Sequence, residues 1–332
     1  MTIAASVVVP TYQRPDLLDR CLAALVAQDF PQDCYEIIVV DDAASAETAR
    51  QVARWQRNSP VTLRYLPMRE AARHGPAAAR NCGWRNACGA IIAFTDDDCV
   101  PDPGWLRAGV TALTAPDACA SAPPLVGGWG RTIVPIPPDP TDYERDAAGL
   151  GRAEALTANA FYHRDALAAV GGFDERFRAA WREDSDLLFT LLERGARIVP
   201  IPAAIVVHPV RAARWGCCLG QQRKSRYNAL LYKKHPQRYR RRIQATPPWG
   251  YYGTVLAGLF AVLSLIPGNR RLALGAAGCW AWQTGRFCAR RLRGTRHTPD
   301  HIAEMLVTSA LIPPLSIYWR LRGAIEFRVV FL

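Results

Sequence analysis

Three consecutive aspartates, Asp96, Asp97 and Asp98, follow an apolar run and precede Pro101. Carboxylates packed this closely repel one another, so the pattern favours a cation or hydrogen-bond donors that neutralise them. An aspartate-rich turn is the alternative, because Asp accepts hydrogen bonds from its own backbone. If the apolar run is a strand, the acidic residues follow its carboxyl end, where open α/β sheets bind ligands. The stretch therefore predicts either a metal site at a sheet edge or a turn.

The elements around this cluster alternate between strand and helix. Apolar, β-branched runs predict strands, and apolar residues three to four positions apart predict helices. The expected strands cover 3–9, 35–40, 62–66 and 91–94. One helix is expected to begin near residue 15, and two more are expected over 46–57 and 77–87. This alternation is typical of βαβ units and of an α/β fold with a mostly parallel sheet. The polar residues that follow these strands would then share one edge.

The pattern from residue 116 to residue 210 is less regular. Its Pro- and Gly-rich part, 116–140, is expected to be a loop that shapes a pocket. Helices are expected over 164–170 and 185–194, and a pair of strands over 198–207. Asp184 stands at the start of the second helix, where the helix dipole favours a carboxylate. A helix cap is therefore one interpretation of Asp184.

Charge is distributed unevenly along the 332 residues. The net charge is +12, yet residues 1–210 hold 20 Lys and Arg against 26 Asp and Glu, whereas residues 211–332 hold 21 against 3. The excess positive charge is thus confined to the second part, where it flanks long apolar runs. Such flanks suit lipid better than a nucleic-acid groove, so no nucleic acid is expected as a partner. The ten cysteines lack paired C-x-x-C spacing and are expected to be reduced thiols.

Six short motifs occur in an order that is typical of one family. They are Ser6 to Tyr12 (SVVVPTY), 38–42 (IVVDD), 79–81 (ARN), 96–98 (DDD), 171–175 (GGFDE) and 183–187 (EDSDL). Together they resemble the family 2 glycosyltransferases of GT-A fold, over about residues 2–209. The resemblance implies a GT-A catalytic domain over 1–210 and an inverting, metal-dependent sugar transfer. A nucleotidyltransferase acting on sugar phosphates and a non-catalytic membrane scaffold of the same fold are the alternatives.

The resemblance also implies roles for individual carboxylates. Asp96 and Asp98 would hold Mg²⁺ or Mn²⁺ against the donor diphosphate, since both metals accept carboxylate and phosphate oxygens. His208 matches the histidine that often completes this metal site, although a partly buried histidine at a strand end is the other interpretation. Asp184 matches the catalytic base that takes the proton of the acceptor hydroxyl. Glu183 and Asp186 are the competing assignments for the base.

The donor is expected to be a UDP-, GDP- or dTDP-sugar. Asn159 matches a position near the donor sugar, and Trp181 and Arg182 are candidates for the acceptor side. Arg14 and Arg73 are expected to be solvated. The residues expected to contact the nucleotide or its diphosphate are Pro10, Thr11, Tyr12, Asp41, Asp42, Arg80, Asp96 and Asp97.

Residues 211–332 are expected to form a basic helical region that associates with membrane lipids. The uncharged run 249–266 would span about 27 Å as a helix, against about 30 Å for a bilayer core. The run 272–282 is too short, and 302–319 contains Glu304 and two prolines. Basic residues flank every run, so a hairpin over 249–288 and helices lying in the interface both remain open. The protein is expected at the cytoplasmic face of the cell membrane, with a lipid-linked or cell-envelope glycan as acceptor.

Overall fold

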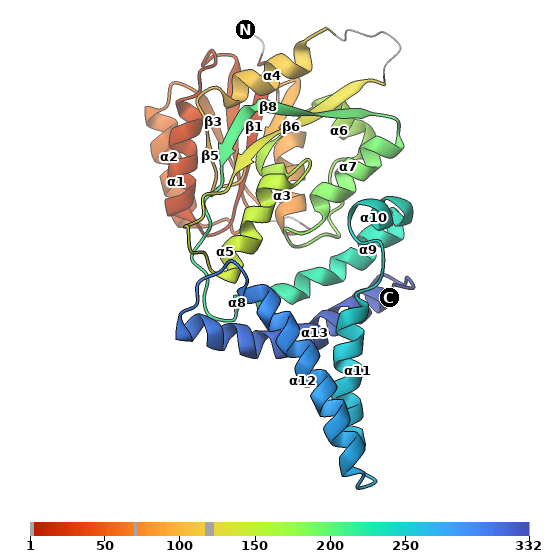
Figure 1. Ribbon diagram of the computed structural model, residues 1–332. Helices are drawn as coiled ribbons and strands as arrows, with labels where there is room; N and C mark the ends of the chain where they lie inside the picture. Colours follow the sequence, from red (N-terminus) through yellow and green to blue (C-terminus); the bar gives the residue numbers. More distant parts are fainter. Residues whose placement is uncertain (1–2, 70–71, 117–122, 332) are drawn as a thin grey trace. The chain divides into compact units, whose positions relative to one another are not determined.

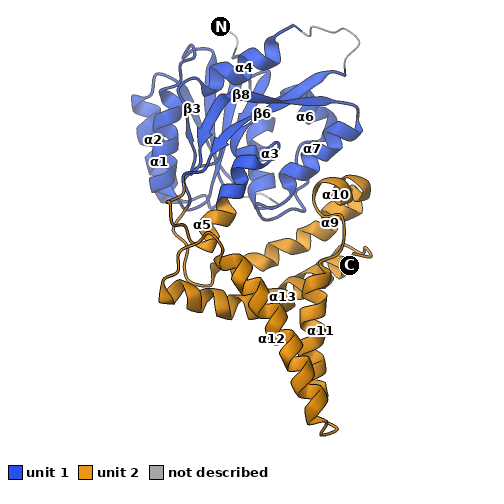
Figure 2. Ribbon diagram, in the orientation of Figure 1, with its two compact units in different colours: residues 1–135, 148–210 blue, residues 136–147, 211–332 orange. Residues whose placement is uncertain are grey.

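The computed structural model describes residues 3–69, 72–116 and 123–331 of the chain (Figure 1). The chain folds into two compact units (Figure 2). Unit 1 comprises Met1–Pro135 and Ala148–Val210, and unit 2 comprises Ile136–Ala147 and Arg211–Leu332. The short segment 136–147 therefore belongs to the second unit, although it lies within the sequence of the first. The expected division into 1–210 and 211–332 places residues 136–147 in the first domain instead.

Unit 1 is built around a sheet. Its strands are β1 (Ala5–Thr11), β2 (Tyr35–Asp41), β3 (Thr62–Pro67), β4 (Ile91–Phe94), β5 (Val100–Pro101), β6 (Leu125–Ile133), β7 (Ala160–His163) and β8 (Arg197–Val207). Among the described residues they form one eight-stranded sheet in the order β3-β2-β1-β4-β7-β6-β8-β5. Strands β1 to β4 are parallel to one another and β6 is parallel to β8, whereas β7 and β5 are antiparallel to their neighbours. The expected α/β fold with a mostly parallel sheet is confirmed.

Helices in the sequence between the strands of unit 1 bury this sheet. They are α1 (Pro15–Val26), α2 (Ala46–Asn58), α3 (Pro76–Arg85), α4 (Trp105–Thr114), α6 (Arg164–Val170) and α7 (Glu183–Glu193), with short 3-10 turns η1 (Ala148–Arg152) and η2 (Thr157–Asn159). Prolines occupy the first turn of α1 and α3, where a helix does not need their missing N–H. Strand β2 is buried at every position, as expected of a parallel strand covered on both faces.

Strand β6 lies in the region that the sequence predicts to be a loop, so that expectation is wrong for Leu125–Ile133. Residues 117–122 of the same region lie outside the described residues. Three glycines make β6 look like a turn, but they are needed because neighbouring strands approach closely. A Cβ on Gly128 would lie 2.7 Å from the carbonyl oxygen of Val199, and one on Gly130 would collide with the backbone of Ala204. Glycine here permits close packing rather than a turn.

Strand β8 is a single strand and not the pair that the sequence predicts. Its pairing with β6 shifts from Gly130↔Ile201 to Arg131↔Ile205, which is a bulge. The prolines at 200 and 202 interrupt the apolar pattern and imitate a strand end. Past the bulge, β8 continues to Val207, opposite Val100 of β5. This continuation determines where the residue after β8, His208, is placed.

Unit 2 consists of helices. They are α5 (Asp142–Ala147), α8 (Cys217–Gln221), α9 (Tyr227–Lys234), α10 (Pro236–Arg242), α11 (Trp249–Leu263), α12 (Arg270–Leu292) and α13 (Pro299–Glu326), with the 3-10 turn η3 (Gln222–Arg226). Helices α11 and α12 pack side by side as an antiparallel hairpin (Figure 1). Arg291 holds the unit together, because its guanidinium binds Asp142 of α5 at 2.8 Å and Thr308 of α13 at 2.7 Å.

The apolar segments of unit 2 differ in length from those that the sequence predicts. Helix α11 ends at Leu263, so its 15 residues extend about 22 Å and the expected span over 249–266 is too long. By length and composition, α13 is the one helix within the described ranges that could cross a bilayer, and 33% of its apolar window is buried inside the protein. Core helices of soluble proteins can have the same length and composition, so membrane association of unit 2 stays a prediction.

Candidate active site

Arg80 connects two of the predicted acidic motifs at the core of unit 1. It lies on α3, and its side chain is only 3% exposed. One terminal nitrogen is 2.8 Å from Asp96, which follows β4, and the other is 3.0 Å from Glu183, the first residue of α7. Both nitrogens are thus occupied by carboxylates of the protein. The Nε of Arg80 has no hydrogen-bond partner among the described residues, and its contact with the diphosphate of the donor stays a prediction.

The two carboxylates at the start of α7 have different surroundings. Glu183 is buried, and its Oε2 has no hydrogen-bond partner among the described residues. Burial raises the pKa of Glu183 above its ordinary value, and the charge of Asp184 adds to the effect, against the opposing charge of Arg80. Asp184 is partly exposed and accepts a 2.6 Å hydrogen bond from the amide of Ser185. Asp186 is buried as well, so Asp184 is the most accessible carboxylate of this motif.

His208 and Asp98 come together because β5 pairs with β8. Val100 stands opposite Val207, so the residues just before β5 lie beside the residue just after β8. The Nε2 of His208 is 3.7 Å from the Oδ1 of Asp98, and the Nδ1 of His208 is buried without a hydrogen-bond partner among the described residues. Asp98, Cys99 and His208 offer ligand atoms within 4.8 Å of one another. Asp96 is instead held by Arg80.

Cys99 was not singled out by the sequence, yet its sulfur belongs to this cluster. Its thiol is fully buried. Burial raises the pKa of Cys99 well above its ordinary value, and the charges of Asp96 and Asp98 raise it further. Metals bind the thiolate and deprotonate a thiol that coordinates them, so all three side chains of this cluster offer a ligand atom to a cation.

Asp97 faces the end of the first strand rather than the group formed by Asp98, Cys99 and His208. Its Oδ2 accepts a 2.8 Å hydrogen bond from the hydroxyl of Thr11, and its Oδ1 is 3.2 Å from Arg14. Burial raises the pKa of Asp97 to about 6, although Arg14 and Thr11 act in the opposite direction. Arg14 was expected to be solvated, and this ion pair corrects that expectation. Arg73 is exposed, as expected.

The acidic pair after β2 stabilises the local backbone. Asp41 is fully buried and accepts hydrogen bonds from the amides of Ala43 and Ser45 and from the hydroxyl of Tyr65. Its carboxylate therefore stabilises the turn after β2, a role that was not part of the expected contact between Asp41 and the nucleotide. The side chain of Asp42 is 13% exposed and accepts bonds from His74 and from the amide of Gly75. Nearby, Pro10 is half-buried at the end of β1, and Tyr12 is 53% exposed.

Asn81 joins two motifs that lie 90 residues apart in the sequence. Its amide nitrogen donates to the carbonyl of Phe173 and to Glu175, and its oxygen accepts from the amide of Phe173 and from the indole of Trp84. Gly172 has φ of +77°, and a Cβ there would collide with the side chain of Asn81. The loop of residues 171–175 is thus fixed against α3, which also holds Arg80.

Asn159 has a structural role in this fold. Its side chain is buried, accepts a 2.8 Å bond from the indole of Trp105 and donates to the carbonyls of Arg131 and Ala204. These bonds use both of its amide hydrogens and fix the side chain in the core, and its contact with the donor sugar stays a prediction. Trp181 is 38% exposed beside the start of α7, and the guanidinium of Arg182 lies 4.7 Å from its ring centre. Both therefore stay candidates for the acceptor side.

Comparison with known proteins connects this geometry to a family. The model of glycosyl transferase family 2 matches residues 6–171, which is half of the chain. The chain is 31% identical over 178 residues to the glycosyltransferase AglE of Haloferax volcanii, a match covering 51% of this chain and 55% of that protein. It is 33% identical over 156 residues to the pre-mycofactocin glycosyltransferase of Mycobacterium tuberculosis, covering 41% and 30%. The matches thus span about half or less of these relatives.

One solved structure has a similar fold over nearly the whole chain. It is the mannosyltransferase PcManGT from Pyrobaculum calidifontis, in complex with GDP-Man and Mn²⁺. The TM-score is 0.54 at 20% identity, and the alignment covers 99% of this chain and 88% of that one. The likeness extends the fold assignment beyond the residues that the family model matches. The sheet is GT-A-like, and the family model matches half of the chain, so the protein belongs to glycosyl transferase family 2.

Proposed function

We propose that unit 1 catalyses an inverting transfer in which Asp184 acts as the base. The oxygen of an acceptor hydroxyl forms a bond to the anomeric carbon of the sugar, and the bond from that carbon to the nucleoside diphosphate breaks. The hydroxyl proton passes to a carboxylate oxygen of Asp184. The observation that carries this proposal is the contrast within α7: Glu183 is buried against Arg80, whereas Asp184 is accessible beside it.

The residues present fit a divalent cation. Asp98 offers a carboxylate oxygen and His208 a ring nitrogen, and the Nδ1 of His208 is buried without a partner among the described residues. Mn²⁺ accepts both kinds of ligand and Mg²⁺ prefers the oxygens. Asp98 and His208 would hold the ion, with Asp96 at its diphosphate side. A bound cation would neutralise the charge that develops on the departing diphosphate.

The donor site is proposed at the carboxyl ends of β1 and β2. Pro10, Thr11 and Tyr12 would line the slot for the base of a UDP-, GDP- or dTDP-sugar, and Asp42 would accept a bond from the base or ribose. Asp41 and Asp97 would act by fixing the backbone and the end of β1. The mannosyltransferase of similar fold was solved with GDP-Man and Mn²⁺, which is consistent with a nucleotide and a cation sharing this edge.

The acceptor is proposed to be a lipid-linked or cell-envelope glycan, reached from the cytoplasmic face of the membrane. The apolar side chains that unit 2 exposes support this location. The test compares transfer to a polyprenyl-linked acceptor with transfer to the soluble glycan portion of the same acceptor. A higher rate with the linked acceptor is expected, and equal rates would count against the membrane acceptor.

The proposed base is tested with Asp184→Asn, which keeps the shape of the side chain and removes its basicity. Transfer should fall by about 10²- to 10⁴-fold, the usual contribution of a general base. Nucleotide binding in the presence of Mn²⁺, measured by thermal shift, should stay close to that of the wild type. Ser185→Ala is the matched control, because it removes a 3.2 Å hydrogen bond to Asp184 and leaves the carboxylate in place. Its rate should fall only a few-fold.

The same assay separates the alternatives. A glycosyltransferase releases a nucleoside diphosphate, whereas a nucleotidyltransferase joins a sugar phosphate to a nucleotide and releases pyrophosphate. A non-catalytic scaffold would release neither. Near wild-type transfer by Asp184→Asn would show that another group is the base, and release of pyrophosphate would refute the proposed reaction.

A further inference from the structure

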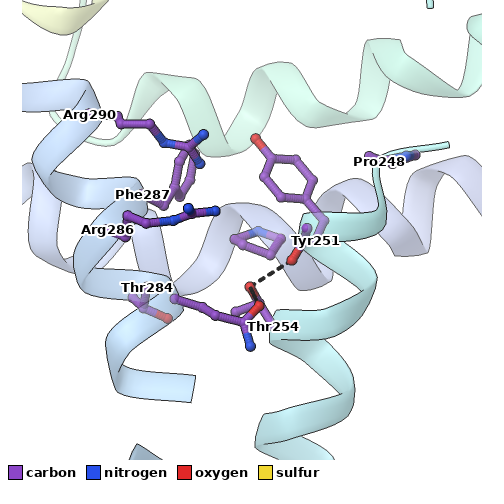
Figure 3. Close-up of a pocket in the computed structure, with 10 residues that line it drawn as sticks. Pro248, Tyr251, Thr254, Thr284, Arg286, Phe287 and Arg290 are labelled. Carbon is purple, nitrogen blue, oxygen red and sulfur yellow. Dashed lines mark hydrogen bonds between the residues drawn. The ribbon is translucent and has the colours of Figure 1, made fainter. Parts of the chain in front are cut away.

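A small pocket lies at the root of the helical hairpin in unit 2 (Figure 3). Its volume is about 170 Å³. This is several times the roughly 30 Å³ that one water occupies in the liquid, which leaves room for a phosphate group but not for a whole lipid. The lining residues come from α11, α12 and α13 and the residue before α11: Pro248, Gly250, Tyr251, Thr254, Gln283, Thr284, Arg286, Phe287, Arg290 and Pro313.

The pocket is basic and contains no acidic side chain in its lining. Arg286 and Arg290 stand four residues apart on α12, so they share one face of the helix (Figure 3). Within the described ranges neither guanidinium has a carboxylate partner. Arg291, the next residue along, does have one in Asp142. Two neighbouring positive charges without a counter-charge favour an anion supplied from outside the chain.

Polar and aromatic groups complete the pocket. The hydroxyl of Thr284 is buried and has no hydrogen-bond partner among the described residues. The hydroxyl of Thr254 already donates to the carbonyl of Gly250, and the rings of Tyr251 and Phe287 provide an apolar wall. A buried hydroxyl without a partner is costly unless a ligand satisfies it. Arginines, a free hydroxyl and aromatic rings together suit the phosphate of an amphiphile.

The hairpin beyond the pocket exposes apolar side chains to the surroundings. The aliphatic and phenylalanine side chains of the hairpin that are at least half exposed are Leu256, Leu259, Phe260, Val262, Leu263, Leu265, Ile266, Leu272 and Leu274. Arg270 and Arg271 stand at the tip, and Arg286 and Arg290 at the root. Charged residues at both ends make insertion of the tip into the hydrocarbon core costly. A hairpin that lies in the interface keeps all four arginines at the level of the headgroups.

We propose that the pocket binds the phosphate of an anionic phospholipid, while the hairpin lies flat among the headgroups. This inference rests on the membrane association proposed for unit 2, and it does not depend on the chemistry of unit 1. The pocket would select lipids that carry a negative headgroup, and the apolar side chains would supply binding that does not depend on headgroup charge.

The experiment measures binding of the full-length protein to vesicles by sedimentation. One set of vesicles contains phosphatidylcholine alone, and the other contains equal parts of phosphatidylcholine and phosphatidylglycerol. Arg286→Gln/Arg290→Gln should weaken binding to the phosphatidylglycerol vesicles by about 10- to 30-fold, because each arginine near an anionic surface contributes about fivefold. Binding to phosphatidylcholine alone should change by less than about threefold.

Arg223→Gln/Arg241→Gln is the matched control, since it removes the same charge from exposed positions of the same unit outside the pocket. It should weaken binding to phosphatidylglycerol vesicles by less than about threefold through long-range charge alone. Equal losses in the two double variants would overturn the proposal, because binding would then follow net charge. Thr284→Val is a nearly isosteric second variant, and an unchanged selectivity for phosphatidylglycerol would also count against the pocket.

Two further arms separate other outcomes. Inorganic phosphate without vesicles is tested by thermal shift. Stabilisation by phosphate that depends on the two arginines, together with unchanged vesicle binding in the arginine variant, would overturn the lipid and identify a free phosphate ligand. Asp184→Asn should bind both kinds of vesicle like the wild type. Loss of transfer and loss of lipid selectivity are thereby measured in different variants, so that failure of one proposal is distinguishable from failure of the other.

Discussion

The two units use arginine in opposite ways. In unit 1, Arg80 is buried and both of its terminal nitrogens bind carboxylates of the protein. In unit 2, Arg286 and Arg290 line a pocket without a carboxylate partner among the described residues, although Arg291 beside them binds Asp142. A charge compensated inside the fold determines geometry and stability. A charge left uncompensated at a pocket is available for a ligand, so the pattern of pairing separates structural from binding arginines.

Arg80→Ala is the strongest way to break this comparison. It leaves Glu183 buried without its counter-charge, so the free energy of unfolding of unit 1 should fall by about 3–5 kcal/mol. A urea titration of the full-length protein measures the change. Arg85→Ala, on the same helix, is the control, because the Arg85 side chain is 50% exposed and lies 3.4 Å from Glu175. It should cost about 0–1 kcal/mol. Similar losses in both variants would mean that burial of the pair does not matter.

Asp142→Asn tests the paired arginine of unit 2. The substitution removes the counter-charge of the buried Arg291 guanidinium and leaves it with neutral partners, so the opening free energy of α12 and α13 should fall by about 1–3 kcal/mol. Hydrogen exchange of the amides in these helices reports the change. Arg290→Gln, at the adjacent position, should change the same quantity by no more than about 0.5 kcal/mol. A larger loss in Arg290→Gln would indicate a structural role for this arginine.

Glu36→Gln tests whether a buried carboxylate that is paired with an arginine makes the free energy of unfolding of unit 1 depend on pH. Glu36 is buried and accepts bonds from Ser6, from the amide of Cys88 and from Arg64. Burial alone would raise the pKa of Glu36, but these bonds outweigh it and the pKa is lowered. A lowered pKa stabilises the fold above the unfolded value, and that contribution is lost as the pH falls through the folded value.

The free energy of unfolding of the wild type should therefore fall below about pH 4, where unfolded glutamate begins to take up protons. The variant should lose about 1 kcal/mol at neutral pH and should depend less steeply on pH in the acid range. Urea titrations at a series of pH values measure both effects. Identical acid slopes in the two proteins would show that Glu36 does not contribute to acid sensitivity.

Much of unit 1 was predictable because its strands and helices follow clear apolar periods. The strands near residues 5–11, 35–41, 62–67 and 91–94 were expected within one or two residues. Strand β6 was missed because its glycines serve close packing, which depends on a neighbouring strand about 70 residues away. Helix α4 was not among the expected helices, although it has an apolar face with Leu106, Val110 and Leu113 buried.

The sequence predicts which residues belong to the site better than it predicts which of their side chains contact one another. The order of strands brings acidic residues to one edge, and that much follows from the sequence. The ion pair between Arg80 and Glu183 joins residues 103 positions apart, which no local pattern encodes. The approach of His208 to Asp98 likewise depends on the bulge that lets β8 continue to its partner β5. Roles for Asp184, Asp98 and His208 remain predictions until activity is measured.

Asn81 has a consequence for how the sequence can vary. Its amide already makes two donations and two acceptances, which is its full capacity for oriented partners. Aspartate would lose both donors, and glutamine would need an extra methylene of room in a fully buried site. Almost no other residue fits at position 81, whereas Arg85, one turn further along α3, is half exposed and can be substituted at little cost. An engineer who wishes to diversify this helix has its exposed face to work with and should leave residue 81 unchanged.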